Sequence, residues 1–187
     1  MEKSFIIAGF GGQGVLLAGE VLASAFMSDD KNVTWYPSYG AEMRGGTVNC
    51  QVVMNDSEEV SSVNKKEVDF VIAMNDLSFE KFLPKLKKGG MMIANSSLVK
   101  EIKKRTDINY IFAPFNKLAS EIGNVKTASM MSLGVLAKAS ELITVEKLIS
   151  ALDSILPEHR KKLLSINIKA IEAGFALNFA LNCQIKA

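Results

Sequence analysis

The chain has 187 residues, 48% of them hydrophobic and 22% charged, a composition typical of a soluble globular protein rather than a disordered, collagen-like or low-complexity chain. Lysine plus arginine number 22 and aspartate plus glutamate 20, so the net charge of +2 gives no electrostatic reason to expect nucleic acid or an anionic membrane as a partner. The length, slightly above the ~150 residues of a typical domain, predicts a single domain over residues 1–187.

The cysteine and histidine content excludes several kinds of site. The only cysteines are Cys50 and Cys183, and the only histidine is His159. A four-cysteine iron–sulfur site or a Cys/His structural zinc site needs more ligands than these. The charged neighbours of His159 indicate an exposed residue near a helix start rather than a catalytic base. Two thiols without a secretory signal indicate a reducing, cytoplasmic setting, and no segment reads as a membrane span.

Strand and helix patterns alternate in the first part of the chain. Strands are predicted at 5–8, 33–36, 47–54, 68–74, 91–94 and 108–113, the last one of the chain. Helices are predicted at 15–27 and 77–86, and Gly89-Gly90 separates the second from the next strand. This order predicts an α/β fold in which residues 1–115 build a Rossmann-like, mainly parallel sheet.

The second part of the chain, residues 116–187, is predicted to be helical. Helices are expected at 117–121, 130–142, 145–155 and 158–181. The last of them carries an apolar stripe at helical spacing, made by Leu164, Ile168, Ile171, Phe175 and Phe179.

A glycine-rich loop separates the first strand from the first helix. Its sequence, Gly9-Phe10-Gly11-Gly12-Gln13-Gly14, contains G-x-G-x-x-G in the strand–loop–helix context that the motif requires. Glycines allow a close backbone approach, and the helix start offers unpaired N–H groups to an anion. Val15-Leu16 stands where an ATP-binding P-loop needs Lys and Ser or Thr. We therefore expect an anion-binding turn, with tight helix–strand packing as the alternative.

The motif alone does not predict a dinucleotide site. An NAD-binding unit carries an acid after its second strand, which here ends at Tyr36-Pro37-Ser38. Asp29 and Asp30 lie at about the right distance but before that strand. NADP has weak support from Ser38 and Arg44. The Asn75-Asp76 segment gives no specific indication.

A second unusual loop, residues 37–47, joins two predicted strands. Among its residues are Tyr39, Gly40, Glu42, Arg44, Gly45, Gly46 and Thr47. Arg44 offers a guanidinium that can bind a carboxylate or a phosphate in a bidentate manner, and the glycines allow a partner to approach closely. The alternative is a Glu42–Arg44 surface pair in a tight turn, which contributes little.

Both loops together resemble the gamma subunit of 2-oxoacid:ferredoxin oxidoreductases. The stretch 37–50 is most similar to the 2-oxoglutarate type, followed by the 2-oxoisovalerate type, with the pyruvate type as a further candidate. Gly123-Asn124, residues 130–134, and residues 167–171 with Gly174 are similar as well, so the resemblance covers nearly the whole chain. The smaller subunit of indolepyruvate:ferredoxin oxidoreductase shares the glycine-loop fold, which leaves the 2-oxoacid open.

The resemblance implies a subunit that is inactive alone. In this family a 2-oxoacid is oxidatively decarboxylated to its acyl-CoA while ferredoxin is reduced. The alpha and beta subunits form the thiamine diphosphate site, and iron–sulfur clusters lie in the beta subunit or in a delta subunit. The gamma subunit is expected to support the CoA side. We accordingly expect neither catalytic residues nor a metal site on this chain alone.

The residues expected to bind the cofactor or a partner subunit come from the two loops: Gly9, Gly11, Gly12, Gln13, Gly14, Tyr39, Gly40, Glu42, Arg44, Gly45, Gly46 and Thr47. Two other functions stay open. One is a freestanding NAD(P)-dependent oxidoreductase, and the other is a purely structural subunit whose glycine loops serve packing alone.

Overall fold

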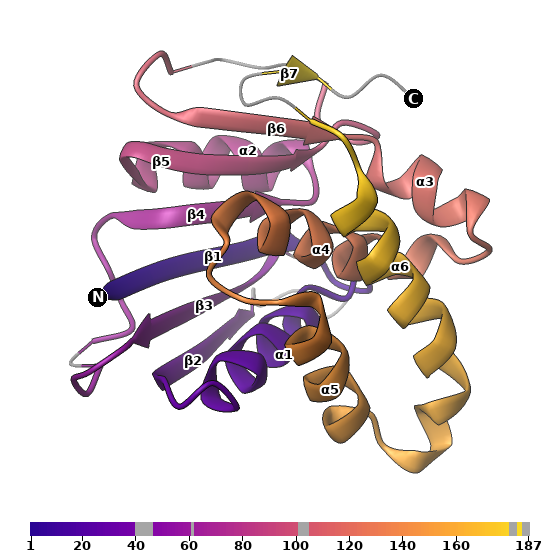
Figure 1. Ribbon diagram of the computed structural model, residues 1–187. Helices are drawn as coiled ribbons and strands as arrows, with labels where there is room; N and C mark the ends of the chain where they lie inside the picture. The colour runs from indigo at the N-terminus through magenta and orange to yellow at the C-terminus, as the bar shows by residue number, and fades with distance from the viewer. Residues whose placement is uncertain (40–46, 61, 101–104, 180–182, 185–187) are drawn as a thin grey trace.

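A seven-stranded sheet crosses the molecule in the order β2-β3-β1-β4-β5-β6-β7 (Figure 1). The computed structural model describes residues 1–39, 47–60, 62–100, 105–179 and 183–184. The strands are β1 (Glu2–Phe10), β2 (Asn32–Tyr39), β3 (Thr47–Asn55), β4 (Val68–Ala73), β5 (Leu86–Asn95), β6 (Asn109–Ala113) and β7 (Cys183–Gln184).

The sheet is mainly parallel, which confirms the predicted α/β class. β1, β4, β5, β6 and β7 pair in parallel in that order, whereas β3 pairs antiparallel with both β1 and β2. The chain therefore returns from its first helix to the sheet edge and then inserts β3 beside β1. This antiparallel hairpin stands where a dinucleotide-binding fold has its second parallel strand. We call the side of the sheet where β1, β4, β5 and β6 end the carboxyl edge, and the opposite side the amino edge.

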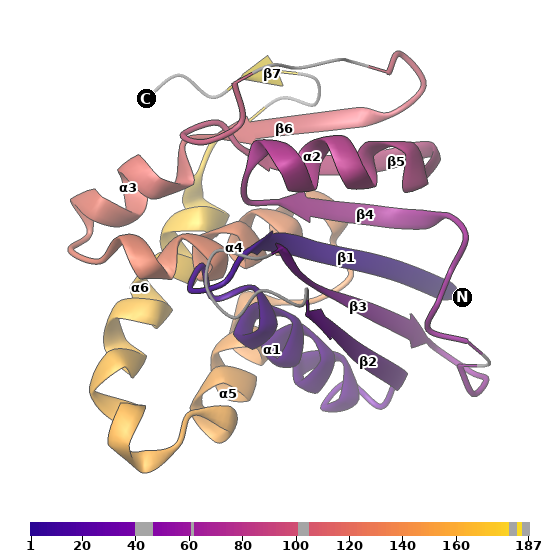
Figure 2. The ribbon, with the colours of Figure 1, turned by 180° about the vertical axis from the view of Figure 1, so that it is seen from behind.

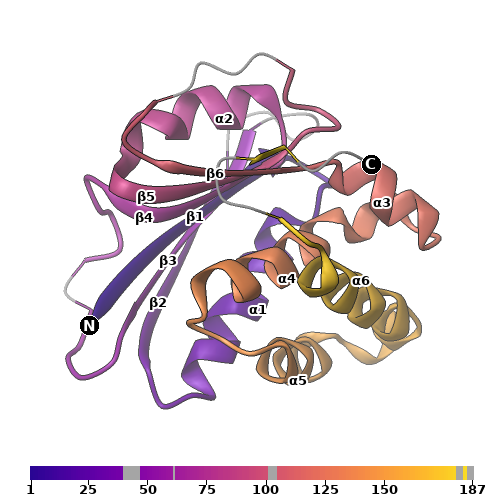
Figure 3. The same ribbon diagram turned by 45° about the horizontal axis from the view of Figure 1, so that its top comes forward.

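The helices cover both faces of the sheet unequally (Figures 2 and 3). Their bounds are α1 (Val15–Met27), α2 (Asp76–Phe82), α3 (Phe115–Glu121), α4 (Ala128–Ser140), α5 (Val145–Ile155) and α6 (Leu164–Ala176), with 3₁₀ turns η1 (Leu83–Lys85), η2 (Val125–Thr127) and η3 (Glu158–Leu163). Buried residues of α1, α4, α5 and α6 join one core on one face. The other face packs against α2.

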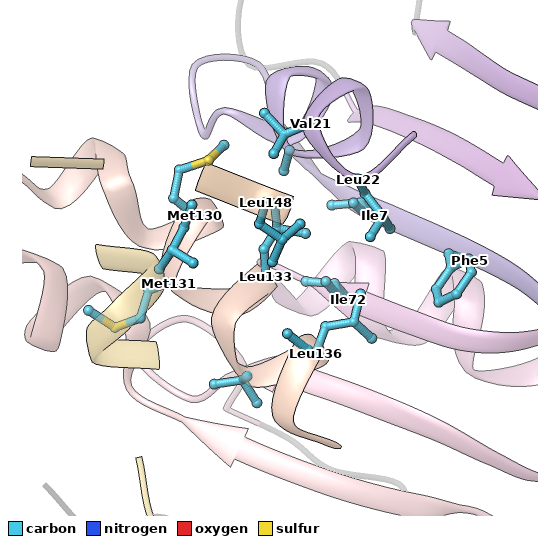
Figure 4. Close-up of a cluster of buried hydrophobic side chains, with 14 of the residues drawn as sticks. Phe5, Ile7, Val21, Leu22, Ile72, Met130, Met131, Leu133, Leu136 and Leu148 are labelled. Carbon is cyan, nitrogen blue, oxygen red and sulfur yellow. The ribbon is translucent and has the colours of Figure 1, made fainter. Parts of the chain in front are cut away.

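Alternation along the strands feeds the two cores. On β1, Phe5 and Ile7 point into the larger core and Ile6 into the smaller one, as the two-residue period of a strand requires. Figure 4 shows Ile7 of the sheet beside Leu22 of α1 and Ile72 beside Leu133 and Leu136 of α4. Each such side chain contributes roughly 1.5–3 kcal/mol by burial. The sheet is thus held rigidly on both faces, which fixes the positions of its edge loops.

Helices α4 and α6 pack with their backbones in direct contact. A Cβ atom on Gly134 would lie 2.0 Å from the carbonyl oxygen of Ile171, and one on Gly174 would lie 2.0 Å from that of Met131. The buried face of α6 is accordingly Asn167, Ala170, Ile171 and Gly174. The predicted apolar stripe holds for Ile171, which is buried, and for Leu164, Ile168 and Phe179, which pack against the core. It is wrong for Phe175, which is 43% exposed because the close approach to α4 requires Gly174 at the contact.

Three predicted boundaries also differ from the structure. The helix expected at 158–181 is a 3₁₀ turn followed by α6, which ends at Ala176, and β7 then adds a strand after the one predicted to be the last. Gly89-Gly90 does not precede β5 but lies within it, since Gly89 has a φ of +78° and the pairing with β4 shifts register there. Within the described residues, no helix has the length and apolarity to cross a membrane.

Candidate functional site at the carboxyl edge

The glycine loop at the end of β1 needs glycine at specific positions. Gly12 and Gly14 have φ of +92° and +75°, a conformation that other residues rarely adopt. A Cβ atom on Gly9 would lie 2.5 Å from Oε1 of Gln13 and 2.9 Å from a methyl of Val15. Gly11 is different, because its nearest neighbour would be 4.0 Å away. The loop therefore depends on three of its four glycines for shape, and Gly11 leaves the surface open.

The side chain of Gln13 closes the loop from inside. Its Oε1 accepts hydrogen bonds from the backbone N–H of Phe10 at 2.6 Å and from Nδ2 of Asn75 at 3.2 Å. Its Nε2 donates to the carbonyl oxygen of Met74 at 3.4 Å. The amide is thus engaged with the protein at both ends. Gln13 therefore shapes the loop through these hydrogen bonds.

Two helices begin beside this loop: α1, which has no side-chain cap, and α4, which follows directly on η2, whose start is capped by the side chain of Asn124. Gly14 is the N-cap of α1, and a Cβ atom there would lie 2.5 Å from Oγ of Ser129 in the first turn of α4. Neither helix carries an acidic residue in its first turn. The Oγ of Ser129 is itself buried without a hydrogen-bond partner among the described residues. The positive ends of two helix dipoles therefore meet at Gly14, an arrangement that favours an anion.

A pocket of about 130 Å³ opens next to the glycine loop. Its walls are Gly12, Gln13, Met74, Asn116, Val125, Lys126 and Ala128. Lys126 is exposed and has no ion-pair partner among the residues that the structure describes. Asp76, the acid that follows β4, instead accepts a hydrogen bond from the backbone N–H of Lys100. A cation, backbone N–H groups and a small volume together suit a phosphate or carboxylate group.

The structure places part of the second predicted loop at the same edge. Phe10, which precedes Gly11, pairs with Thr47, and Tyr39 pairs with Val48. Tyr39 is 67% exposed. Both ends of the loop therefore lie one or two strands away from the glycine loop. The remaining predicted residues, Gly40, Glu42, Arg44, Gly45 and Gly46, lie outside the described residues.

Sequence reasoning missed the polar residues that complete the site. Asn75 and Asn95 follow or end the parallel strands β4 and β5, while Asn116 and Lys126 belong to α3 and η2. A signal existed for the first two, because a polar residue at the end of a buried parallel strand lies at the ligand-binding edge of an α/β sheet. No local pattern indicates Asn116 or Lys126, since they reach the loop only through the packing of α3 and α4 on the sheet.

The other cysteine and histidine side chains that the structure describes offer no second site of this kind. Burial raises the pKa of the Cys50 thiol to about 12, so it stays protonated and unreactive at neutral pH. His159 is exposed in η3, as expected from its charged neighbours. Within the described part of the chain, no three His, Cys, Asp or Glu side chains are grouped so that they could hold a metal ion.

A protein-family model matches most of the chain. The model described as pyruvate ferredoxin/flavodoxin oxidoreductase matches residues 4–177 of this chain. That match includes the glycine loop, the residues around the pocket, and the glycines at which α4 and α6 touch.

Two curated relatives and one solved structure are similar over most of the chain. The 2-oxoglutarate synthase subunit KorC of Methanothermobacter marburgensis is 33% identical over 181 residues, which cover 93% of this chain and 95% of KorC. The ketoisovalerate oxidoreductase subunit VorA of the same organism is 33% identical over 168 residues, 90% of this chain, but the chain spans only 35% of VorA. The keto/oxoacid ferredoxin oxidoreductase gamma subunit from Geobacter sulfurreducens superposes with a TM-score of 0.78 at 26% identity, covering 92% of this chain and 96% of that one.

Proposed function

The chain belongs to the pyruvate ferredoxin/flavodoxin oxidoreductase family, and from that membership we propose that it is the gamma subunit of a 2-oxoacid:ferredoxin oxidoreductase. The reaction is the CoA-dependent oxidative decarboxylation of a 2-oxoacid. The acid loses carbon dioxide, its acyl group passes to the CoA thiol, and an electron pair passes to ferredoxin. The relationship to KorC over nearly the full length of both chains favours 2-oxoglutarate as the substrate.

The observation that carries the proposal is the pocket beside the glycine loop at the carboxyl edge. CoA carries phosphate groups, and the pocket of about 130 Å³ beside Lys126 has room for one such group but not for a whole nucleotide. We propose that Lys126 and the N–H groups of Gly12 and Gly14 bind a CoA phosphate. The remainder of CoA would extend from this edge toward the partner subunits. The chain's contribution is then to bind and orient CoA.

The second loop supports the same role from the side of β2. We propose that Tyr39 and Thr47 meet a partner subunit and that Arg44 binds a carboxylate or phosphate there. The exposed apolar side chains of Tyr39, Leu77 and Val125 all belong to this edge, with exposed fractions of 67%, 55% and 47%. Apolar exposure around a ligand site is expected where a subunit interface covers it.

We propose that partner subunits carry out the remaining steps of the reaction. Thiamine diphosphate, held by the alpha and beta subunits, would supply the decarboxylation, and iron–sulfur clusters in the beta or a delta subunit would carry electrons to ferredoxin. With two cysteines, this chain cannot itself supply a four-cysteine cluster site. We propose that the complex works in the cytoplasm, where such thiols stay reduced.

The first test is anaerobic affinity purification of the chain from its native cells. The expected result is co-purification of at least two further subunits with bound thiamine diphosphate and iron, and 2-oxoacid-dependent dye reduction that requires CoA. A chain that comes back alone and binds NAD(P) with micromolar affinity would contradict the proposal and support a freestanding dehydrogenase.

The anion site is then tested in the assembled complex with Lys126→Ala. Loss of one charge-assisted contact to phosphate should raise KM for CoA about tenfold with little change in kcat. Lys117→Ala is the matched control, since Lys117 is an exposed lysine of α3 that does not line the pocket. Arg44→Ala should lower turnover without unfolding the chain. Unchanged CoA and 2-oxoacid kinetics in both Lys126→Ala and Arg44→Ala would leave only a structural role.

A further inference from the structure

We infer that a relay of side-chain amides, Gln13, Asn75, Asn95 and Asn116, positions the glycine loop and the opposite pocket wall as one rigid unit, with Asn95 as its central positioning residue. The inference rests on the proposed function for its kinetic consequence, because the unit would position CoA. The hydrogen bonds of the relay itself all join residues that the structure describes.

The central member is completely buried at the end of β5. Nδ2 of Asn95 donates to the carbonyl oxygen of Met74 at 3.3 Å and to Oδ1 of Asn116 at 2.9 Å. Its Oδ1 accepts a hydrogen bond from the backbone N–H of Ser97 at 3.3 Å. Asn95 thus uses both amide protons to join the end of β4 to α3. No other residue type of this size offers two donors and an acceptor without a charge.

The carbonyl oxygen of Met74 is the point where the two halves of the relay meet. It accepts from Asn95 on one side and from Nε2 of Gln13 on the other. Gln13 in turn holds the N–H of Phe10, while Asn75 donates to Gln13 and caps α2 by accepting from the N–H of Ser78 at 2.9 Å. Hydrogen bonds therefore run without interruption from Asn116 on the pocket wall to the backbone of the glycine loop.

Neutral amides suit this position better than charged groups. Asn75 and Asn95 are 3% and 0% exposed, and a carboxylate or ammonium there would need a compensating charge. A negative charge would also oppose an anion at the adjacent helix ends. Because buried hydrogen bonds polarise one another in a low-dielectric interior, the relay fixes its members more firmly than separate surface contacts would. Both pocket walls are thereby pre-organised before a ligand arrives.

The consequence is a specific kinetic effect. Without Asn95, the glycine loop and α3 would be ordered only when the phosphate binds, and the binding free energy would be reduced by that ordering. We expect Asn95→Ala to raise KM for CoA about tenfold, to leave KM for the 2-oxoacid unchanged and to change kcat less than twofold. A general loss of stability would instead lower the amount of active complex and leave both KM values unchanged.

The experiment combines steady-state kinetics of the assembled complex with amide hydrogen exchange of the full chain. Exchange is measured at Phe10 and Gln13, whose N–H groups are hydrogen-bonded within the loop. Asn95→Ala should accelerate both amides at least fivefold. The matched control is Asn109→Ala, which also removes an Nδ2 donor to a carbonyl, that of Gly89, but at the amino edge. Should Asn95→Ala fail to fold, Asn116→Ala removes only the last acceptor of the relay and is the variant to measure.

The outcomes separate this inference from the proposed function. Faster loop exchange together with a raised KM for CoA supports the relay, provided that Asn109→Ala changes neither. Unchanged exchange at Phe10 and Gln13 in a folded variant overturns the relay, whatever the enzyme assays show. A wild-type complex without CoA-dependent activity overturns the proposed function, whereas the exchange result would still decide whether the relay exists.

Discussion

The polar side chains at the two edges of the sheet have different kinds of partner. At the amino edge, charged side chains form the ion pairs Met1 ammonium–Asp56, Lys31–Asp56, Lys65–Glu2, Lys3–Asp69 and Lys87–Asp69, in which five cations share three carboxylates. At the carboxyl edge, among the described residues, neutral amides bond to one another and to backbone, and no ion pair joins the loops around the pocket.

This difference distinguishes the two edges as binding sites for an anion. At the amino edge the cations already pair with carboxylates, so an anion would have to compete with these existing partners. At the carboxyl edge the starts of α1 and α4 have no acid in their first turns, and Lys126 is unpaired among the described residues. The positive field there is therefore available to an anion.

The largest expected effect comes from filling the space behind the glycine loop. Gly9→Ala would place its Cβ 2.5 Å from Oε1 of Gln13, 2.9 Å from Val15 and 3.0 Å from Cβ of Met74. Overpacking of this kind lowers the free energy of unfolding by about 2–3 kcal/mol, which corresponds to roughly 5–10 °C in Tm. Gly11→Ala, with its nearest neighbour at 4.0 Å, is the matched control and should change Tm by about 1 °C. Equal shifts in the two variants would show that the loop is not held from inside.

Asp69 at the amino edge accepts hydrogen bonds from Ser4 and Lys87 and also pairs with Lys3. Burial alone raises its pKa, but hydrogen bonds from the N–H and hydroxyl of Ser4 and from Lys87 outweigh burial and hold the pKa below its ordinary value of 3.8. A lowered pKa stabilises the fold above pH 3.8, and this contribution is lost as the pH falls through the pKa of the folded state.

Asp69→Asn should therefore lower the free energy of unfolding by about 2 kcal/mol at pH 7, the usual size for hydrogen bonds to a charged group. The difference from the wild type should shrink below pH 4, because the wild-type carboxylate is then protonated in the unfolded state and, at still lower pH, in the folded one. Denaturant unfolding between pH 2.5 and 7 measures it, with Glu58→Gln as an exposed control. If the difference in the free energy of unfolding between Asp69→Asn and the wild type stayed constant over that pH range, titration of Asp69 would not contribute to the stability of the fold.

The sequence predicts the carboxyl edge in outline because its main features are local. A strand, a glycine cluster and a helix start follow one another in residues 5–27, and each has a composition that only that structure explains. The same holds for the parallel order of the sheet, since strands separated by helix-length segments favour crossovers. The α/β class and the glycine loop therefore follow from the sequence.

The features that the sequence does not predict depend on contacts between distant residues. The carbonyl oxygen of Met74 accepts hydrogen bonds from Gln13 and Asn95, which lie 61 and 21 residues away in sequence. No local sequence pattern predicts contacts over such separations. The apolar stripe of the last helix is wrong at one position, Phe175, for a related reason. Its burial depends on Gly134 of α4, which brings the two backbones so close that Gly174 faces inward in place of Phe175. Periodicity indicates an amphipathic helix but not the partner that selects its buried face.

A smaller effect is expected from replacing one glycine at each edge by alanine. Gly12 at the carboxyl edge and Gly89 at the amino edge both have positive φ, +92° and +78°, and a Cβ on either would meet nothing within 4 Å. Alanine at either position should therefore lower the free energy of unfolding equally, by about 1 kcal/mol. Only Gly12→Ala should also raise KM for CoA in the assembled complex, by about fivefold, because it alters the backbone that we propose to bind phosphate. Similar KM values in both variants would show that the two edges do not differ in ligand binding.

The smallest effect is expected from a single ion pair of the amino edge. Nζ of Lys65 lies 2.8 Å from Oε1 of Glu2, and both side chains are partly exposed. Because solvent screens such a pair, a double-mutant cycle of Lys65→Ala and Glu2→Ala should give a coupling free energy below about 0.5 kcal/mol, which disappears in 1 M salt. A coupling above about 1.5 kcal/mol would mean that the amino edge is held together by its charges. The smaller value would mean that this pair adds little to the free energy of unfolding, so that the amino edge does not depend on it for its structure.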